Sequence, residues 1–223
     1  MPVSCVDKNQ GVHQMAVARD HLQFEAQPPR GVYHPAFDQD TSFKRYIDAI
    51  TELVDNDVDD LPCRVAKELC ELVKQEDWLP EACRGGCTES YCRHVLYADP
   101  EGRFTVMSIV WNPGQATPVH GHTAWGAVGV YEGHPSVDVY ECDDGKTAKK
   151  TAEISCCPGE VSHVLKGTDA PHCVYNSSDD VAITIHTYGR DICRFHTVDL
   201  DSGKLTPVDA HYTNAANPSN GSQ

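Results

Sequence analysis

The sequence predicts a mainly β fold in which two N-terminal helices cap a single β-barrel. Residues 42–76 carry apolar side chains at three- and four-residue steps, which is the period of an amphipathic helix. From about residue 91 the pattern changes to short β-rich runs separated by turn residues. Regular short strands of this kind indicate a sandwich or barrel rather than a parallel βαβ sheet.

The N-terminal part is expected to pass from irregular chain into two helices. Residues 1–40 contain prolines and little periodicity, so we expect irregular structure there. The first helix should follow Asp40 or Thr41 as its cap, and the second should span 63–73, just after Pro62. The apolar face of the first helix is formed by Phe43, Tyr46, Ile47, Ile50, Leu53 and Val54.

The β-rich runs are separated by turn sequences such as Asp-Pro-Glu-Gly, Asn-Pro-Gly and Asp-Asp-Gly. We expect strands at 91–97, 104–111, 126–131, 136–141, 161–165, 173–175, 181–188 and 193–199. The tail is rich in Asn, Ser and Gly, which predicts disorder. The chain therefore divides into an irregular segment at 1–40, one domain at 41–210 with its barrel at about 91–200, and a disordered tail at 211–223.

Length and charge limit the classes of partner. The chain of 223 residues is long enough to bury one sizeable core, and its net charge of −15 would repel nucleic acid and an anionic membrane surface. No apolar run approaches the roughly 20 residues of a membrane span, and the first residues lack the apolar stretch of a signal peptide. We expect a cytoplasmic monomer or small homo-oligomer with no nucleic-acid or membrane partner.

The chain has eleven cysteines, an odd number, and disulfides are uncommon in cytosolic proteins. Cys83, Cys87 and Cys92 with His94 could supply four zinc ligands, but Cys-x2-Cys pairs are missing, so we expect reduced thiols. The neighbours Cys156 and Cys157 would point to opposite faces of a strand, which makes them a poor joint ligand.

The histidines offer a clearer chemical pattern. His120 and His122 are two residues apart, so on a strand both imidazoles lie on one face. Two neutral imidazoles on an inward face each bring a donor and an acceptor into the core, which favours metal binding over packing alone. Gly121 and Gly126 leave room for a small molecule beside them.

These residues belong to a pattern that resembles the cupin superfamily. Gly114-Gln-Ala-Thr-Pro-Val-His120-Gly-His122, with Gly133 after it, resembles the first cupin motif, and His172-Cys-Val-Tyr-Asn176 resembles the end of the second. The glutamate ligand usual in the first motif is replaced here by Gly126 and Ala127. The resemblance implies a double-stranded β-helix, a jelly-roll barrel, whose metal is held by histidines.

Three histidines without the glutamate narrow the resemblance to the thiol dioxygenases, which include cysteine dioxygenase and 3-mercaptopropionate dioxygenase. The similarity spans about residues 42–200. It is carried by Asp77-Trp-Leu-Pro80, Tyr91-x-Arg93-x-Val-Leu-Tyr-Ala-Asp-Pro100, Trp111-x-Pro-Gly-x-x-Thr-Pro-Val-His120, His122-Thr-x-Trp-Gly-x-x-Gly-Val and Ile183-Thr-Ile-His-Thr-Tyr-Gly189.

The resemblance implies that His120, His122 and His172 hold Fe(2+), with His163 as the rival of His172. A set of three histidines suits several divalent metals and leaves positions open for a substrate thiolate, a second donor and O2. Metal binding favours the thiolate, and both oxygen atoms then add to sulfur to give a sulfinate. The expected partners are thus a small thiol and O2.

A second group follows from alternation along one strand. Thr184, His186 and Tyr188 share a face and could form a hydroxyl–imidazole–phenol chain. The alternative is an outward polar face with Ile183 and Ile185 inward. The resembled family has Ser, His and Tyr here and places the tyrosine near the iron. Some members cross-link that tyrosine to a cysteine, for which the matching region, Gly126–Ala127, offers none.

Arg93 bears most directly on the substrate. In cysteine dioxygenases the matching arginine, two residues after a tyrosine (here Tyr91), binds the substrate carboxylate, for which a guanidinium is well shaped. The alternative is a solvent-facing arginine. Trp125 is a third expected substrate contact, although its context resembles the mercaptopropionate branch. We expect oxidation of L-cysteine to cysteine sulfinate, with 3-mercaptopropionate or mercaptosuccinate as the alternative.

Two other classes of function remain open. A different metal-dependent cupin enzyme, either an isomerase or a dioxygenase acting on carbon, would need a carboxylate ligand or a site for an oxidisable ring. Neither shows in the motif. A noncatalytic cupin binding module would more often have lost its histidines, whereas all of them are present here.

Overall fold

The computed structural model describes residues 37, 41–122, 124–142, 147–164, 170–190, 194–210 and 212–213. Residues 1–36, the predicted cap Asp40 and most of the predicted tail lie outside this part. The helices are α1 (Thr41–Asp55) and α2 (Leu61–Val73), followed by a short 3-10 helix, Glu81–Cys83. The strands are β1 (Cys92–Ala98), β2 (Thr105–Trp111), β3 (His120–Gly121), β4 (Gly126–Glu132), β5 (Ser136–Cys142), β6 (Ala148–Ser155), β7 (Val161–Val164), β8 (His172–Tyr175), β9 (Ala182–Tyr188), β10 (Arg194–Val198) and β11 (Leu205–Asp209).

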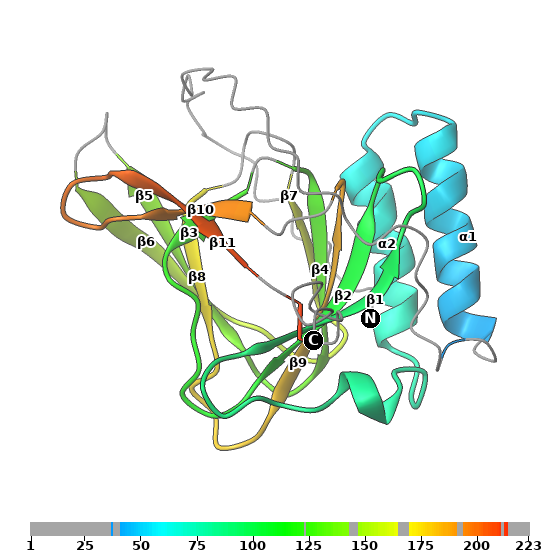
Figure 1. The fold of residues 1–223 in the computed structure, drawn as a ribbon, viewed down its shortest axis with the longest axis horizontal. Coiled ribbons are helices and arrows are strands. Elements are labelled where there is room, and N and C mark those ends of the chain that lie inside the picture. Colours follow the sequence, from blue (N-terminus) through cyan, green and yellow to red (C-terminus); the bar gives the residue numbers. More distant parts are fainter. Residues whose placement is uncertain are drawn as a thin grey trace, which may run out of the picture.

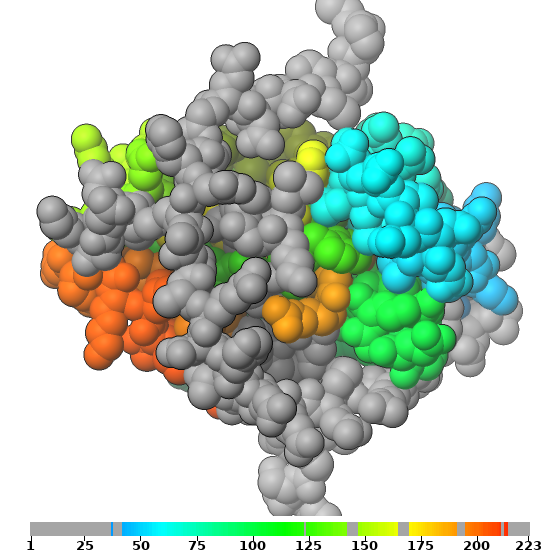
Figure 2. Space-filling view, turned by 90° about the horizontal axis from the view of Figure 1, so that it is seen from above, coloured from blue at the N-terminus to red at the C-terminus, as the bar shows by residue number. Residues whose placement is uncertain are grey.

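The strands form two antiparallel sheets that face each other. Sheet A has the order β1-β2-β9-β4-β7, and sheet B has the order β11-β10-β3-β8-β5-β6. Figure 1 shows the helices against the side of sheet A that faces away from sheet B. From above, the helices and the β10–β11 hairpin lie on opposite sides of the molecule (Figure 2). The predicted fold class, a mainly β double-stranded β-helix with N-terminal helices, is confirmed.

Sheet A separates two interiors. Strands β1, β2 and β9 are buried along their whole length. Because side chains alternate along a strand, one face of sheet A packs on the helices and the other faces the barrel. The helix-side core contains Phe43, Ile47, Ile50, Leu69, Leu72, Val106, Val110, Ala127, Ile183 and Ile185. The barrel-side cluster contains Val95, Ala98, Met107, Ile109, Trp111, Ala182, Tyr188 and Tyr212.

Gly129 sets how closely α2 approaches β4. A Cβ at this position would lie 3.0 Å from Val73 Cγ1 and 3.2 Å from Leu69 Cγ. Any larger side chain would push the helix away from the sheet, because protein cores are close-packed.

All eight predicted β-rich runs are confirmed as strands, but three further strands, β3, β6 and β11, were not predicted. β3 has only two residues, and nearly all of β6 and β11 is exposed to solvent. An exposed edge strand needs no apolar alternation, and Pro207 in β11 is tolerated at such an edge. Cys156 and Cys157 follow β6 in irregular chain just before a turn, and not in a strand.

The expectation of reduced thiols is wrong for one pair, because Cys87 and Cys92 form a disulfide with a Cα–Cα distance of 5.5 Å. The loop before β1 folds back on that strand, where the ring Nε2 of His94 donates to the carbonyl of Gly85 (2.9 Å). The four candidate zinc ligands do not form a metal-ligand group in the described part of the chain. Cys83 is a buried thiol whose pKa is raised to about 11 by burial.

Two residues of the tail that was expected to be disordered, Tyr212 and Thr213, lie within the described part of the chain. The backbone N–H of Thr213 donates to the carbonyl of Arg93 at 2.7 Å, so the chain beyond β11 docks on β1. The ring of Tyr212 is buried in the barrel-side cluster. None of the helices described is long and apolar enough to cross a membrane.

The β1–β2 turn is held by one buried carboxylate. Asp99 accepts hydrogen bonds from the backbone N–H groups of Glu101 and Arg103 and from the Arg103 guanidinium, which also contacts Asp55 at the end of α1. Burial alone would raise the pKa of Asp99, but its hydrogen bonds and the charge of Arg103 outweigh burial and lower it. The turn and helix α1 are thereby joined through Arg103.

Replacing Asp99 should therefore destabilise the fold. We expect Asp99→Ala to lower the free energy of unfolding by about 2 kcal/mol, because buried donors lose their acceptor. Since the folded pKa lies below the unfolded value of 3.8, this stabilisation is complete above that pH and is lost as the pH falls through the folded pKa. Urea unfolding at several pH values measures the difference, with the exposed Asp201→Asn as control. Equal stability of Asp99→Ala and wild type at pH 7 would contradict this role.

Candidate metal centre

Three imidazoles meet inside the barrel. His120 in β3 pairs directly with His172 in β8, and His122 follows β3 by one residue. One nitrogen from each of the three rings lies within 4.8 Å of the other two. Ring centroids are 4.5 Å apart for His120 and His172 and 4.8 Å apart for His120 and His122. The structure thus brings together the three residues that the sequence analysis grouped.

Backbone carbonyls orient two of the rings. Nδ1 of His120 lies 3.0 Å from the carbonyl oxygen of Pro118, and Nδ1 of His172 lies 2.8 Å from that of Ala170. A carbonyl can only accept, so Nδ1 carries the proton in both rings and Nε2 keeps its lone pair. This second interaction is the usual way in which a protein fixes the tautomer of a metal-binding histidine. The donor set therefore fits a divalent transition metal.

His163 does not belong to this group. Its strand neighbours in β7, Ser162 and Val164, line the barrel cavity, so alternation directs His163 outward. Its side chain is exposed, and its partner across the sheet is Ala127, which lies in the helix-side core. The structure therefore favours His172 over His163 as the third ligand.

A buried polar chain runs along β9 beside the imidazoles. Thr184 Oγ1 lies 2.7 Å from His186 Nε2, and His186 Nδ1 lies 3.0 Å from the hydroxyl of Tyr188. The indole Nε1 of Trp111 donates to Thr184 Oγ1 at 2.9 Å. These residues face the barrel, whereas Ile183 and Ile185 face the helices. The alternative of an outward polar face is wrong.

The indole of Trp111 gives this chain a direction. Because Trp111 can only donate, the Thr184 hydroxyl accepts from it and directs its own proton to His186 Nε2. Burial, followed by the nearby His122 and Arg93, lowers the pKa of His186 well below its usual value, so the ring is neutral and carries its proton on Nδ1. His186 Nδ1–H therefore donates a hydrogen bond to the Tyr188 oxygen. The hydroxyl proton of Tyr188 is then directed away from His186.

Tyr188 lies next to the imidazoles because Gly126 leaves space for its ring. A Cβ at Gly126 would stand 2.7 Å from two ring carbons of Tyr188. The Tyr188 ring centroid is 5.1 Å from that of His122. Gly126 therefore admits the Tyr188 phenol beside His122.

The three imidazoles, Trp111, His186 and Tyr188 border one cavity of about 360 Å³. Its lining includes Tyr91, Arg93, Met107, Ile109, Trp111, Thr117, His120, His122, Val128, Val137, Val139, Ile154, Cys156, Ser162, Val164, Ala170, His172, Val174, His186, Tyr188 and Phe195. Arg93 is only 7% exposed, so the alternative of a solvent-facing arginine is wrong. Tyr91 stacks on Trp111 with ring centroids 4.8 Å apart, and burial raises the pKa of its phenol.

Of the three expected substrate contacts, Trp125 is not among the described residues that line the cavity. Its indole lies over Gly189, where a Cβ would be 2.2 Å from Nε1, and the side chain packs against the helix-side core. Sequence reasoning in turn missed Trp111 and Tyr212. Alternation in β2 could have placed Trp111 inward with Met107 and Ile109, but nothing in the tail marked Tyr212.

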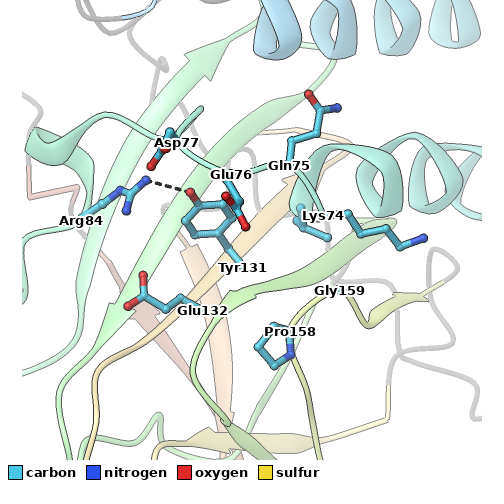
Figure 3. A pocket seen from close by; sticks show the side chains of 10 residues that line it. Lys74, Gln75, Glu76, Asp77, Arg84, Tyr131, Glu132, Pro158 and Gly159 are labelled. Atoms are coloured by element: carbon cyan, nitrogen blue, oxygen red, sulfur yellow. Dashed lines mark hydrogen bonds between the residues drawn. The ribbon is translucent and has the colours of Figure 1, made fainter.

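A second hollow, of about 450 Å³, lies outside the barrel between the end of α2 and β4. Figure 3 shows Arg84 donating to the hydroxyl of Tyr131, a bond of 2.8 Å. Its described lining contains Lys74, Glu76, Asp77 and Glu132 but neither histidine nor cysteine. Among the described residues, the group placed to hold a metal ion is that of the three histidines in the barrel.

Comparison with known proteins adds structural neighbours. No family model matches this chain. TT1209 from Thermus thermophilus is 21% identical with a TM-score of 0.41, over 52% of this chain and 98% of that one. The Cupin_2 domain of an XRE family transcriptional regulator from Enterobacter cloacae is 20% identical with a TM-score of 0.37, over 46% and 99%. A cupin-superfamily sugar phosphate isomerase from Silicibacter pomeroyi is 19% identical with a TM-score of 0.34, over 48% and 68%. Cupin proteins are thus among the neighbours, and the reaction has to be inferred from the site.

Metal analysis can test the choice of the third ligand. We expect His172→Ala to lower the affinity for iron(II) by more than about 100-fold. Removing a residue that only hydrogen-bonds to a metal ligand already lowers metal affinity by about 10- to 100-fold, and loss of a ligand itself should cost more. His163→Ala is the matched control and should bind iron like the wild type. Iron content is measured by mass spectrometry after reconstitution and desalting. Full iron content in His172→Ala, or loss in His163→Ala, would contradict the assignment.

Proposed function

We propose that the protein is an iron(II)-dependent thiol dioxygenase that converts a small thiol carboxylate into its sulfinate. The observation that supports this most is the convergence of Arg93, three imidazoles and the Tyr188 hydroxyl on one cavity. A molecule with a carboxylate at one end and a thiol at the other matches a cation facing a metal-ligand set. The reaction RS⁻ + O2 → RSO2⁻ balances without an external reductant.

The metal would be held by His120, His122 and His172, whose neutral nitrogens fit it. A ferrous ion bound there would favour the thiolate form of the substrate and supply the electron exchange that O2 needs. The chain's own residues would bind the substrate, direct a proton and limit access of water.

Arg93 would bind the carboxylate. Its guanidinium can present two parallel N–H groups to one carboxylate, which fixes the orientation of the substrate as well as its position. With that end held, the sulfur is directed toward the imidazoles. Tyr91 borders the same end of the cavity and stacks on Trp111.

Tyr188 would donate a hydrogen bond to the sulfur end of the substrate, which is anionic both as thiolate and as sulfinate. The hydrogen-bond chain from Trp111 through Thr184 and His186 donates to its oxygen from one side, so the hydroxyl proton is directed away from His186. Thr184 and His186 are positioning residues in this scheme. The apolar walls limit access of water, which strengthens each of these polar contacts.

The cavity favours a thiol carboxylate without an ammonium group. Among the lining residues that the structure describes, only Arg93 carries a charge at neutral pH when the imidazoles are neutral. No carboxylate lies among the described lining residues to pair with the ammonium of L-cysteine, and burying that charge without a counter-charge is costly. This favours 3-mercaptopropionate over L-cysteine, the substrate expected from the sequence.

Oxygen uptake by the iron(II)-loaded protein tests the proposed reaction. We expect uptake with 3-mercaptopropionate at a higher kcat/KM than with L-cysteine, cysteamine or mercaptosuccinate, and one sulfinate formed per O2. An oxygen electrode and mass spectrometry of the product in ¹⁸O2 measure both. No uptake with any of the four thiols, in protein shown to contain iron, would overturn the proposal.

Arg93 can be tested by a change that removes its charge. We expect Arg93→Gln to raise KM for 3-mercaptopropionate by about 10- to 100-fold, the range for losing hydrogen bonds to a charged group. KM for cysteamine, which has no carboxylate, should stay near the wild-type value. Arg84→Gln in the outer hollow is the control. Unchanged kinetics of Arg93→Gln with 3-mercaptopropionate would exclude Arg93 from carboxylate binding.

A further inference from the structure

Tyr212 and Thr213, here called the C-terminal clasp, dock on β1 at Arg93 itself. The backbone N–H of Thr213 donates to the carbonyl of Arg93 at 2.7 Å, and the backbone N–H of Arg93 donates to Thr213 Oγ1 at 3.1 Å. Both backbone polar groups of Arg93 are therefore bound by the clasp. These contacts fix the main chain from which the guanidinium projects.

The side chain of Tyr212 holds the other end of Arg93. The guanidinium carbon lies 4.9 Å from the centroid of the Tyr212 ring, a cation–π contact. Tyr212 is only 8% exposed and belongs to the barrel-side cluster with Met107 and Tyr188. Arg93 Nη2 also lies 3.7 Å from the sulfur of Met107. These described contacts of the guanidinium are to uncharged groups.

The clasp spans the seam between the two sheets. β1 ends the strand order of sheet A, and β11 ends that of sheet B. The chain leaves β11 at Asp209 and reaches Arg93 on β1 at Thr213. In Figure 1 the red end of the described chain runs from β11 to the strands of sheet A. Arg93 thus lies on the edge strand of sheet A, at the point where the chain that leaves β11 contacts it.

We propose that the clasp positions Arg93 and that Tyr212 thereby determines specificity for thiols that carry a carboxylate. This inference rests on the function proposed above. The Tyr212 ring lies over the guanidinium carbon, and a contact of this kind does not itself use the in-plane N–H groups through which a guanidinium binds a carboxylate. An acidic partner would instead compete for those N–H groups. Tyr212 restricts the rotamers of Arg93 without consuming its donors, so less freedom is lost when substrate binds.

Two substitutions at Tyr212 separate stacking from packing. Tyr212→Leu keeps an apolar side chain in the cluster but removes the aromatic face, and it should raise KM for 3-mercaptopropionate by about tenfold. Tyr212→Phe keeps the face and should stay within about twofold of wild type. KM for cysteamine and kcat for both thiols should change little in either variant. Thr213→Val removes one bond to Arg93 and should raise KM for 3-mercaptopropionate by about threefold.

Tyr131→Leu is the matched control, because the Arg84 guanidinium lies 5.2 Å from the Tyr131 ring in the outer hollow (Figure 3). It removes a cation–π contact of the same kind outside the barrel and should leave KM unchanged. Thermal melting confirms that each variant folds. If Tyr212→Leu does not fold, Thr213→Val carries the test by itself.

Binding measured without oxygen distinguishes the clasp from the dioxygenase reaction. Anaerobic calorimetry of the iron(II)-loaded protein with 3-mercaptopropionate should show Kd raised about tenfold in Tyr212→Leu. If no thiol is oxidised but this shift is found, the proposed reaction is overturned and the clasp is supported. Wild-type Kd and KM in folded Tyr212→Leu would overturn the clasp, and so would equal losses in Tyr212→Phe and Tyr212→Leu or an equal rise of KM for cysteamine.

Discussion

The burial of both faces of β9 is the constraint on which the rest of the structure depends. β9 lies between β2 and β4, and all seven of its residues are buried. A slip of one residue would exchange its two faces and place the Thr184, His186 and Tyr188 side chains against the helices. The helices are therefore part of the site: by covering Ile183 and Ile185, they fix the register in which the polar residues face the cavity.

A polar chain inside a core is stable only when its members are satisfied. Here Trp111 supplies a donor at the start, and each bond that follows uses the proton of the group before it. The last proton of the chain, on the Tyr188 hydroxyl, is thereby directed away from His186. The pairing of β2 with β9 sets this up, because it places Ile109 opposite Thr184 and brings the next inward residue, Trp111, to the hydroxyl. The reactive end is thus determined by sheet register as much as by residue type.

Residue spacing along a single strand was enough to predict which side chains share a face. The spacing of His120 and His122, and the alternation of Thr184, His186 and Tyr188, place side chains on a face without knowledge of the fold. Contacts that depend on how a loop folds back had no such signal: the Cys87–Cys92 disulfide depends on how the preceding loop returns to β1, and Trp125 packs away from the cavity. β6 was missed because its exposed Lys and Glu residues pair with β5 through the backbone, which composition does not reveal.

The net charge of −15 makes the surroundings of Arg93 important. The thiol carboxylate proposed above would have to approach an acidic protein, and a positive charge inside the cavity would favour its binding. The partners that the structure describes for the guanidinium, the sulfur of Met107 and the ring of Tyr212, keep it in place and leave its charge intact. In a cavity with apolar walls that charge acts over a longer distance than in water. An arginine held by uncharged groups is therefore how an acidic chain could select an anion.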